Sequence, residues 1–503
     1  MVASVCEPSA LQKGHLLKPN ILFIMTDQQR GDCVAANGNK ILQTPQMDRL
    51  ARQSVNFHHA YVQAPVCVPS RVSFFTGRYP HSHRNRVNYT PLDPRETLMQ
   101  ARLRDAGYRT GVVGKLHYYP ATPEEARRTG FDFVELHDAV PFCDQWSDYV
   151  KWQKVQDPNR KSYYRALAKD IQPGCNPFRT EIRDEFHETT WTGLRTRHHL
   201  EKLAQAKQPF FLFSSFFKPH ADFELPAPFA DMYNHVEIPL PPTITAADIQ
   251  KLPAPLRRLV EREDYLQYND REWLQWIYRS YYGAISQIDR EVGLILDTLQ
   301  KTGLADNTIV VFTSDHGDQL CEHGIMGKNC FYDSSVRVPL MISYPGRVRP
   351  GTTDELVESI DLLPTLFELA GLEEPRESQG TSLAPLLVPG SRPYASREAV
   401  FCENIIPEVI TGGKYDWEFK KGSGIKDTRH PDAKMVRTRR WKFNYYPDGY
   451  AELYDLANDP AENINLHGRP QYREVEEEMK GRLLHWLITA DEPDQIAPRW
   501  LLH

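Results

Sequence analysis

Three runs of mostly apolar residues predict strands that are buried on both faces. They span residues 20–25, 210–217 and 308–312. A strand with one face in water alternates apolar and polar positions, whereas these runs are close to continuous. Continuous runs are typical of parallel sheets that carry helices on both faces. The pattern therefore indicates an α/β fold built on a parallel sheet.

A helical pattern lies between the second and third runs. Its apolar residues recur at steps of three and four positions: Ile285, Ile288, Val292, Ile295 and Leu299. This spacing places them on one face of a helix that crosses back over the sheet, and Gly303 is suited to end it. Open α/β sheets bind ligands beyond the carboxyl ends of their strands. The residues that follow each strand are therefore the first candidates for a site.

After about residue 390 the pattern changes to short strand-like pieces joined by turns. Residues 442–446 and 452–456 are the clearest, with a Pro-Asp-Gly turn between them. A small antiparallel sheet is the expected structure.

The chain is thus expected to contain two domains. Residues 1–390 would form a large α/β domain and residues 391–503 a smaller α+β domain. Within the first, residues 120–185 and 222–280 are rich in Trp, Tyr, Pro and charged residues. This composition predicts long insertions above the sheet rather than core.

Composition and charge exclude several classes of protein. The 503 residues carry a formal net charge of −6, with Lys and Arg spread along the chain, so we expect no nucleic-acid partner. No stretch approaches the roughly 18 consecutive apolar residues of a membrane helix, and residues 1–20 lack the apolar core of a secretory signal. We expect a cytoplasmic protein with no membrane partner, or a periplasmic or secreted one if a signal peptide has been removed.

The cysteines show neither CxxC pairs nor the density of a disulfide scaffold. They are Cys6, Cys33, Cys67, Cys143, Cys175, Cys321, Cys330 and Cys402. Most are expected to be buried thiols.

Potential metal ligands follow two of the predicted strands. Asp27 and Gln28 follow the first run, and Asp315 and His316 follow the third. Carboxylate and amide oxygens favour hard divalent cations, which points to calcium first, with magnesium or manganese as alternatives. Taken alone, each Asp would more often cap the helix or turn after its strand.

Cys67 stands in the segment Ala-Pro-Val-Cys-Val-Pro-Ser-Arg, residues 64–71. The plainest interpretation is a buried structural thiol. A cysteine-protease interpretation would need a histidine partner, which no nearby pattern specifically supplies. Neither explains Pro69 and Arg71. An arginine at this spacing suits a charge-assisted contact with an anion or a carboxylate.

Six blocks of sequence, in order from about residue 20 to residue 466, resemble the type I sulfatases of the alkaline phosphatase superfamily. The first, Cys-Val-Pro-Ser-Arg at 67–71, resembles the family's formylglycine signature. The others are residues 107–117, 218–220, 314–328, 360–365 and 453–460. The resemblance implies an alkaline-phosphatase-like large mixed sheet sandwiched by helices, with a smaller C-terminal antiparallel-sheet domain. Residues 1–390 would then be the catalytic domain.

The resemblance also implies the reaction. A separate maturation enzyme would convert Cys67 to formylglycine (3-oxoalanine), whose hydrate attacks the sulfur of a sulfate ester. Asp27, Gln28, Asp315 and His316 would hold the divalent metal, with residue 67 as a further ligand. Coordination to a metal favours an ionised nucleophile and offsets the charge of the sulfuryl oxygens.

Five more residues receive roles from their places in the matching blocks. Lys115, His220 and Lys328 would surround the ester, with His220 as general acid and Lys328 as the second choice. His117 and Arg71 would orient the nucleophile and its surroundings. Alone, each of these residues would more often be a surface charge or a structural histidine.

The substrate expected on family grounds is a sulfated sugar from a polysaccharide. Lys218 and Asn88 are its predicted contacts. The two insertions are expected to shape the leaving-group pocket, together with a stretch that contains Trp417, Lys420, Lys421 and His430.

Two residues depart from the family's pattern. Val68 is bulkier than the small residue that usually follows the cysteine, and Leu116 replaces a more usual aromatic residue. Neither removes a reacting group. Val68 bears instead on recognition by the maturation enzyme.

Two other functions stay open. A phosphonate monoester or phosphodiester hydrolase would use the same metal ligands and the same formylglycine, and residues 84–92 resemble that branch. That branch typically lacks the pair Lys115 and His117, which favours a sulfate ester here. A non-catalytic sulfated-sugar binder would be expected to lose a metal ligand or Cys67, and this chain retains them all.

Overall fold

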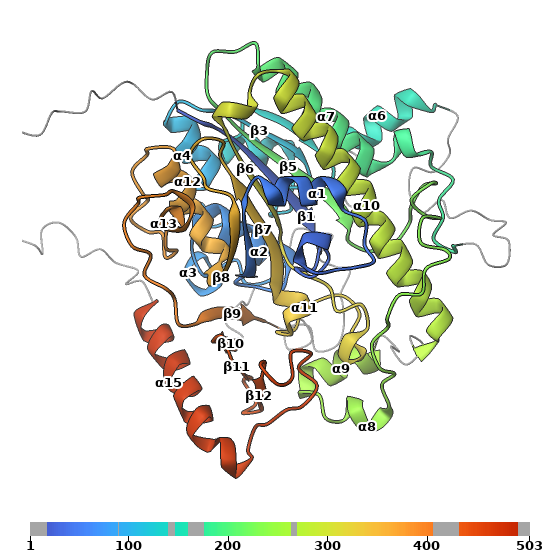
Figure 1. Ribbon diagram of the computed structural model, residues 1–503, viewed down its shortest axis with the longest axis vertical. Helices are drawn as coiled ribbons and strands as arrows, with labels where there is room; N and C mark the ends of the chain where they lie inside the picture. Colours follow the sequence, from blue (N-terminus) through green and yellow to red (C-terminus); the bar gives the residue numbers. More distant parts are fainter. Residues whose placement is uncertain are drawn as a thin grey trace, which may run out of the picture.

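The chain folds around two sheets, a large one of eight strands and a small one of four, in the residues that the structure describes (Figure 1). The computed structural model describes residues 18–88, 90–138, 146–158, 176–262, 269–405 and 432–490. No helix within these ranges is long and apolar enough to cross a membrane.

The large sheet is mixed, in the order β4-β3-β5-β1-β6-β7-β2-β8. Strand β7 is antiparallel to both of its neighbours, whereas the other pairs are parallel. The strands are β1 Asn20–Asp27, β2 Val55–Tyr61, β3 Arg109–Gly114, β4 Phe133–Leu136, β5 Phe210–Pro219, β6 Thr308–Ser314, β7 Arg337–Ser343 and β8 Gly351–Glu358. The three predicted strands are β1, β5 and β6, which lie side by side and parallel at the centre.

Helices cover both faces of this sheet (Figure 1). One face carries α2 Cys67–Thr76, α4 Met99–Asp105, α5 Pro123–Arg128, α12 Leu362–Leu369 and α13 Ala384–Leu387. The other carries α1 Pro45–Arg52, α7 Glu188–Leu203 and α10 Arg271–Lys301. Shorter or peripheral helices are α3 Pro80–His83, α6 Asp148–Gln156, α8 Ala246–Ile249, α9 Ala254–Arg262 and α11 Asp333–Val336.

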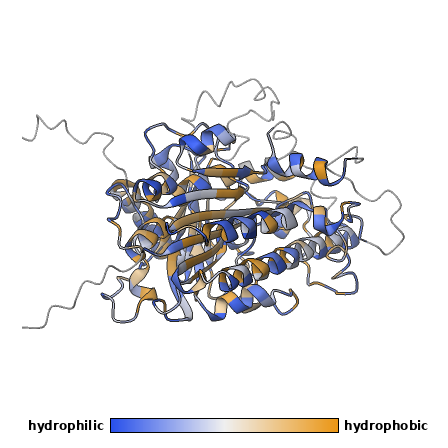
Figure 2. Ribbon diagram, turned by 90° about the horizontal axis from the view of Figure 1, so that it is seen from above, coloured by the Kyte–Doolittle hydropathy of each residue, from blue (hydrophilic) through white to orange (hydrophobic). Residues whose placement is uncertain are grey.

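The central strand β1 is buried along its whole length. Ile21, Phe23 and Met25 pack with the helices of the α2 side. Leu22 and Ile24 pack with the helices of the α10 side. Because successive residues of a strand face opposite sides, a strand that is covered on both faces must be apolar throughout. Figure 2 shows the result, with apolar strands lying between helices whose outer faces are hydrophilic.

Both segments expected to be insertions contribute to the core, and the prediction is wrong for these parts of them. Strand β4 lies within residues 120–185 and forms one edge of the large sheet. Four residues that include a glutamate are too short a pattern to stand out among charged neighbours. Helix α10 begins within residues 222–280, where the Asp270 side chain accepts hydrogen bonds from two backbone N–H groups of the first turn. This cap was a usable start signal.

The small sheet is antiparallel, as predicted, in the order β12-β11-β10-β9. Its strands are β9 Val400–Asn404, β10 Ala433–Arg437, β11 Trp441–Tyr445 and β12 Ala451–Asp455. One face packs under α15 Arg473–Thr489 and the other joins the core of the large sheet. The predicted pocket stretch with Trp417 and His430 lies outside the described residues.

Gly114 ends β3 just before Lys115, and we expect it to be irreplaceable. Its φ is 95°, and an added Cβ would lie 2.0 Å from the Ser215 carbonyl oxygen. Gly114→Ala should therefore lower the free energy of unfolding by about 3 kcal/mol or more, from left-handed strain plus the steric clash. The control is Gly303→Ala, where φ is 73° and nothing lies within 4 Å, so that only about 1–2 kcal/mol should be lost. Denaturant unfolding measures both, and equal losses would contradict the clash.

Candidate metal and catalytic site

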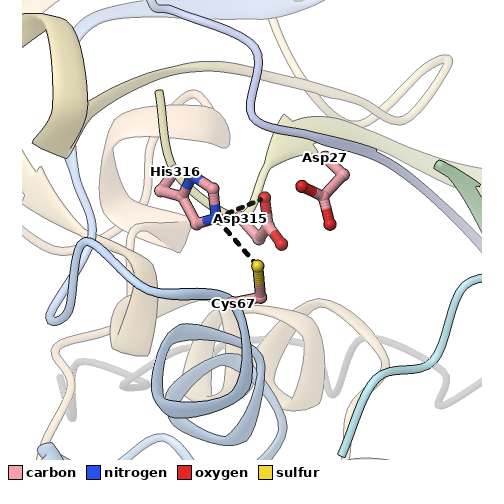
Figure 3. Close-up of side chains that lie close together, drawn as sticks. All are labelled: Asp27, Cys67, Asp315 and His316. Carbon is pink, nitrogen blue, oxygen red and sulfur yellow. Dashed lines mark hydrogen bonds and ion pairs between the residues drawn. The ribbon is translucent and has the colours of Figure 1, made fainter. Parts of the chain in front are cut away.

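The site lies where β1 and β6 end. Because these parallel strands are neighbours, Asp27 at the end of β1 lies beside Asp315 and His316, which follow β6. Helix α2 begins at Cys67 and points its first residue at the same place (Figure 3). Residues from three distant parts of the chain thus converge.

The four side chains form one buried cluster. Their potential ligand atoms all lie within 4.8 Å of one another. Asp27, Asp315 and His316 are 0% exposed and Cys67 is 1% exposed. Cys67 Sγ lies 3.2 Å from His316 Nε2, and His316 Nδ1 lies 2.9 Å from the Gly317 carbonyl oxygen, to which it donates. This bond orients Nε2 toward the cluster.

Gln28 joins the cluster through a constrained backbone. Its φ of 72° is in the left-handed region, which non-glycine residues adopt mainly at special sites. Its amide Nε2 donates to Asp318, so that Oε1 faces the cluster and accepts from Lys328 Nζ at 2.8 Å. Asp318 was not assigned a role from the sequence. Its position three residues after Asp315 was the only signal.

Arg71 bridges the two carboxylates. Its Nη2 donates to Asp27 Oδ2 at 3.1 Å and its Nε donates to Asp315 Oδ2 at 2.8 Å. Its Nη1 donates to the Lys115 carbonyl and to Ser215 Oγ, both at 2.9 Å. All three charged side chains are fully buried. Arg71 therefore holds the carboxylates in place and connects α2 to the strand ends. The contact with Ser215 was not predicted from the sequence.

Two lysines add positive charge. Lys328 Nζ lies 3.0 Å from Cys67 Sγ, and Lys115 Nζ lies 2.7 Å from Asp27 Oδ2. Burial and Asp27 raise the pKa of the Cys67 thiol, but Lys328, His316 and Lys115 outweigh them and leave it below its ordinary value. The site therefore stabilises negative charge at residue 67.

Two histidines stand at the rim of the cluster. Burial holds the pKa of both histidines well below its ordinary value. Lys115 lowers the pKa of His117 further, and Lys328 lowers that of His220 further. The backbone N–H of His117 donates to Asp138 Oδ2 at 2.8 Å. The Nδ1 atom of His220 contacts the Ala221 carbonyl oxygen. Burial thus favours the neutral form of both rings.

Lys218 and Asn88, the predicted substrate contacts, have partners within the chain. Lys218 is 4% exposed, contacts the Asp222 carbonyl and lies 3.6 Å from Glu188 Oε1. Asn88 Oδ1 accepts from the backbone N–H of Val68 at 3.0 Å, and so caps the start of α2 beside Cys67. Their contact with substrate stays a prediction.

Asp27 Oδ1 and His117 Nδ1 are buried and have no hydrogen-bond partner among the described residues, and Lys115 Nζ has an ion pair with Asp27 Oδ2 but no further hydrogen bond there. Buried polar atoms are almost always satisfied, so such atoms point to a group that completes them. An orphaned carboxylate oxygen beside Asp315, His316 and the Gln28 amide oxygen fits a divalent cation. Lys115 has donors to spare beyond its ion pair with Asp27, and these fit an anion next to it.

Comparison with known proteins identifies the family. The Sulfatase family model matches residues 19–372, and a second, described as N-sulphoglucosamine sulphohydrolase, C-terminal, matches residues 321–488. The chain belongs to the sulfatase family. It is an enzyme of the alkaline phosphatase superfamily that hydrolyses sulfate esters, and the fold expected from the resemblance is confirmed.

Individual relatives extend over nearly the whole chain. It is 30% identical to an arylsulfatase of Clostridium perfringens over 95% of this chain and 96% of that one. It is 25% identical to an N-acetylglucosamine-6-O-sulfatase of Bacteroides thetaiotaomicron over 95% and 87%, respectively. A phosphonate monoester hydrolase of Agrobacterium radiobacter superimposes with a TM-score of 0.76 at 25% identity, over 94% of this chain and 96% of that one.

A divalent cation should stabilise the protein through this cluster. At about a hundredfold excess over its Kd, calcium should add roughly 2.7 kcal/mol to the free energy of unfolding, and a chelator should reverse the gain. Asp315→Asn should abolish the response because it removes a ligand charge. Asp306→Asn, an exposed residue before the opposite end of β6, is the control and should respond like the parent. Thermal unfolding with calcium, magnesium and manganese also ranks the metals, and an unchanged response in Asp315→Asn would place the ion elsewhere.

Proposed function

We propose that this sulfatase removes sulfate from a sulfated carbohydrate, using a formylglycine made from Cys67 beside a divalent cation, calcium first. The observation that carries the proposal is the thiol of Cys67, buried among two carboxylates, His316 and Lys328. A thiol is a poor ligand for a hard cation, whereas oxygen is a good one. Conversion of Cys67 to the hydrated aldehyde would put oxygen where the thiol sulfur lies, beside the proposed metal ligands.

Asp27, Gln28, Asp315 and His316 would hold the cation, which would favour an ionised nucleophile and offset charge on the ester. Formylglycine at position 67 would supply, as its hydrate, one hydroxyl as the nucleophile and a second that allows sulfate to be released with the aldehyde regenerated. A separate maturation enzyme would make formylglycine from Cys67. Val68 is bulkier than the usual residue after the cysteine, and it therefore bears on whether that enzyme recognises the segment.

The residues of the chain bind and orient the ester. Lys328 Nζ lies 3.0 Å from residue 67 and Lys115 Nζ lies 2.7 Å from Asp27 Oδ2, so that with Arg71 three cationic side chains stand among the carboxylates of the cluster. The two ammonium groups suit an anion beside residue 67, and a bound cation would add to that attraction. Arg71 orients the carboxylates, because its donors are already engaged.

His220 is the proposed general acid. Its pKa is lowered by burial and by Lys328, while Asp27 opposes them. An anionic ester beside the ring opposes both lowering effects, so that His220 gains its proton in the complex and gives it to the departing alcohol. Lys328 is the second choice, and His117 would orient the nucleophile.

A carbohydrate substrate is supported by the likeness to the N-acetylglucosamine-6-O-sulfatase. Lys218 and Asn88 stay the proposed contacts. Because both are engaged within the chain, they would reach the sugar only by exchanging or sharing those partners.

A phosphonate monoester hydrolase is the second candidate, favoured by the likeness to the Agrobacterium radiobacter enzyme. The metal ligands would serve either ester. The pair Lys115 and His117 favours sulfate, because the phosphonate branch typically lacks it. Lys115 Nζ lies within the cluster, 2.7 Å from Asp27 Oδ2.

Protein made together with a maturation enzyme should carry formylglycine at position 67. Peptide mass spectrometry should show loss of the thiol there, and Cys67→Ala should lower kcat by about a thousandfold or more, because the nucleophile is gone. Cys402→Ala, at another fully buried thiol, is the control and should keep its turnover. An unmodified Cys67 in fully active protein would refute the mechanism.

The matured enzyme should prefer sulfate esters. In a panel of defined sulfated saccharides, an aryl sulfate, choline sulfate and a phenyl phosphonate ester, we expect the highest kcat/KM for a sulfated sugar. Lys115→Met should lower that value about a hundredfold or more, because a buried cation is lost from the ester. A phosphonate rate far above all sulfate rates would select the second candidate, and no turnover of any sulfate despite formylglycine and metal would indicate a sugar binder.

A further inference from the structure

The residues just after Lys328 are held by the small C-terminal sheet. We call residues 328–333 the lysine segment. At one end, Lys328 Nζ lies 3.0 Å from Cys67 Sγ and 2.8 Å from Gln28 Oε1. At the other end, Asp333 begins α11. The segment thus runs from the reacting residue to the junction between the two sheets.

Three strands of the small sheet contact the lysine segment. Asn404 Nδ2, at the end of β9, donates to the Asn329 carbonyl oxygen at 2.8 Å. Lys442 Nζ, from β11, donates to the Phe331 carbonyl oxygen at 3.0 Å. The buried carboxylate of Glu452, from β12, accepts from Tyr332 at 3.4 Å.

Lys442 is the centre of these contacts. It is 0% exposed, and its Nζ lies 2.5 Å from Asp333 Oδ1 and 2.6 Å from Glu462 Oε1. Glu462 in turn accepts from the Asp333 backbone N–H at 2.6 Å. A buried lysine is stable only when paired, and its removal would leave two buried carboxylates facing each other. Tyr61 Oη also donates to Asp333 Oδ2 at 3.1 Å, so Lys442 shares the end of the lysine segment with other groups, and it alone among them also bonds the Phe331 carbonyl.

Two further contacts hold the start of the segment. The Asn329 N–H donates to the Pro65 carbonyl at 3.3 Å, and the Gly327 N–H donates to Asp318 at 3.1 Å. Both fix the start of the segment, and Asn329 itself has a left-handed φ of 75°. Without Lys442 the segment loses the bond at Phe331 and one partner of Asp333, and we expect the backbone between there and Lys328 to relax from this conformation.

We propose that Lys442 is a positioning residue for catalysis, which holds the ammonium of Lys328 against residue 67 from the C-terminal sheet. The inference rests on the proposed role of Lys328. On this proposal the small sheet takes part in the reaction through its contacts with the lysine segment, and the sequence similarity did not predict these contacts. The C-terminal family match begins at residue 321, so Lys328 lies within the unit that includes the small sheet.

A double-mutant cycle tests the proposal. Lys442→Met should lower kcat about tenfold or more with little change in KM, because displacement of a catalytic group by about 1 Å is costly. In a Lys328→Met background the same substitution should change kcat by less than about twofold, since its effect passes through Lys328. The matched control is Lys434→Met on β10, which pairs with Glu403 and Asp432 and should act alike in both backgrounds.

Two further variants guard against unfolding. Lys442→Met combined with Glu462→Gln removes the pair without a change in net charge, and Asn404→Ala removes one hydrogen bond. Both should lower kcat and speed hydrogen exchange of the amides in residues 328–333 in folded protein. An equal loss from Lys442→Met in both backgrounds, or unchanged exchange in this segment, would overturn the proposal.

The exchange measurement separates this proposal from the proposed function. If the enzyme prefers a phosphonate ester, the sulfatase assignment of the substrate fails, and the cycle is measured with that ester. With either ester, an equal fall in kcat from Lys442→Met in both backgrounds would reject Lys442 as a positioning residue, even if exchange in residues 328–333 became faster.

Discussion

Two carboxylates buried side by side at the ends of neighbouring strands are the constraint on which this structure depends. Asp27 and Asp315 are fully buried, and without a counter-charge each would be very costly to bury. Arg71 supplies that charge to both at once. Loss of one partner from such a buried cluster costs about 3–5 kcal/mol, a large part of the roughly 5–15 kcal/mol that stabilises a folded domain. Folding and assembly of the site are therefore one event.

The same constraint places Cys67. Arg71 is one turn into α2, so its bonds to the strand ends bring the start of that helix, and Cys67 with it, to the cluster. Asn88 then caps the helix at Val68. Arg71, Lys115 and Lys328 place three cationic side chains around these carboxylates, which suits a site that receives an anionic ester.

The small sheet belongs to this arrangement rather than standing beside it. Its one face joins the main core, and its buried charges reach the segment that carries Lys328. The buried cluster thus draws on β1, α2, β6 and a segment that the C-terminal sheet contacts. A sulfatase and a phosphonate hydrolase can share this frame because it is built to hold charge, whereas the pair Lys115 and His117 is local to one strand end.

The amino-acid sequence by itself determined the central strands, the crossing helix and the antiparallel C-terminal sheet, because apolar spacing is a local property. It also pointed to Asp27, Gln28, Cys67, Asp315 and His316, since short motifs and strand ends can be read locally. It missed β4, whose four residues carry too little pattern, and the true start of α10. Only the tertiary structure decided that Arg71 bridges both carboxylates, that Asp318 orients Gln28 and that Lys442 supports Lys328. These contacts join residues far apart in the chain, and their energies exist only once burial removes water from the charges.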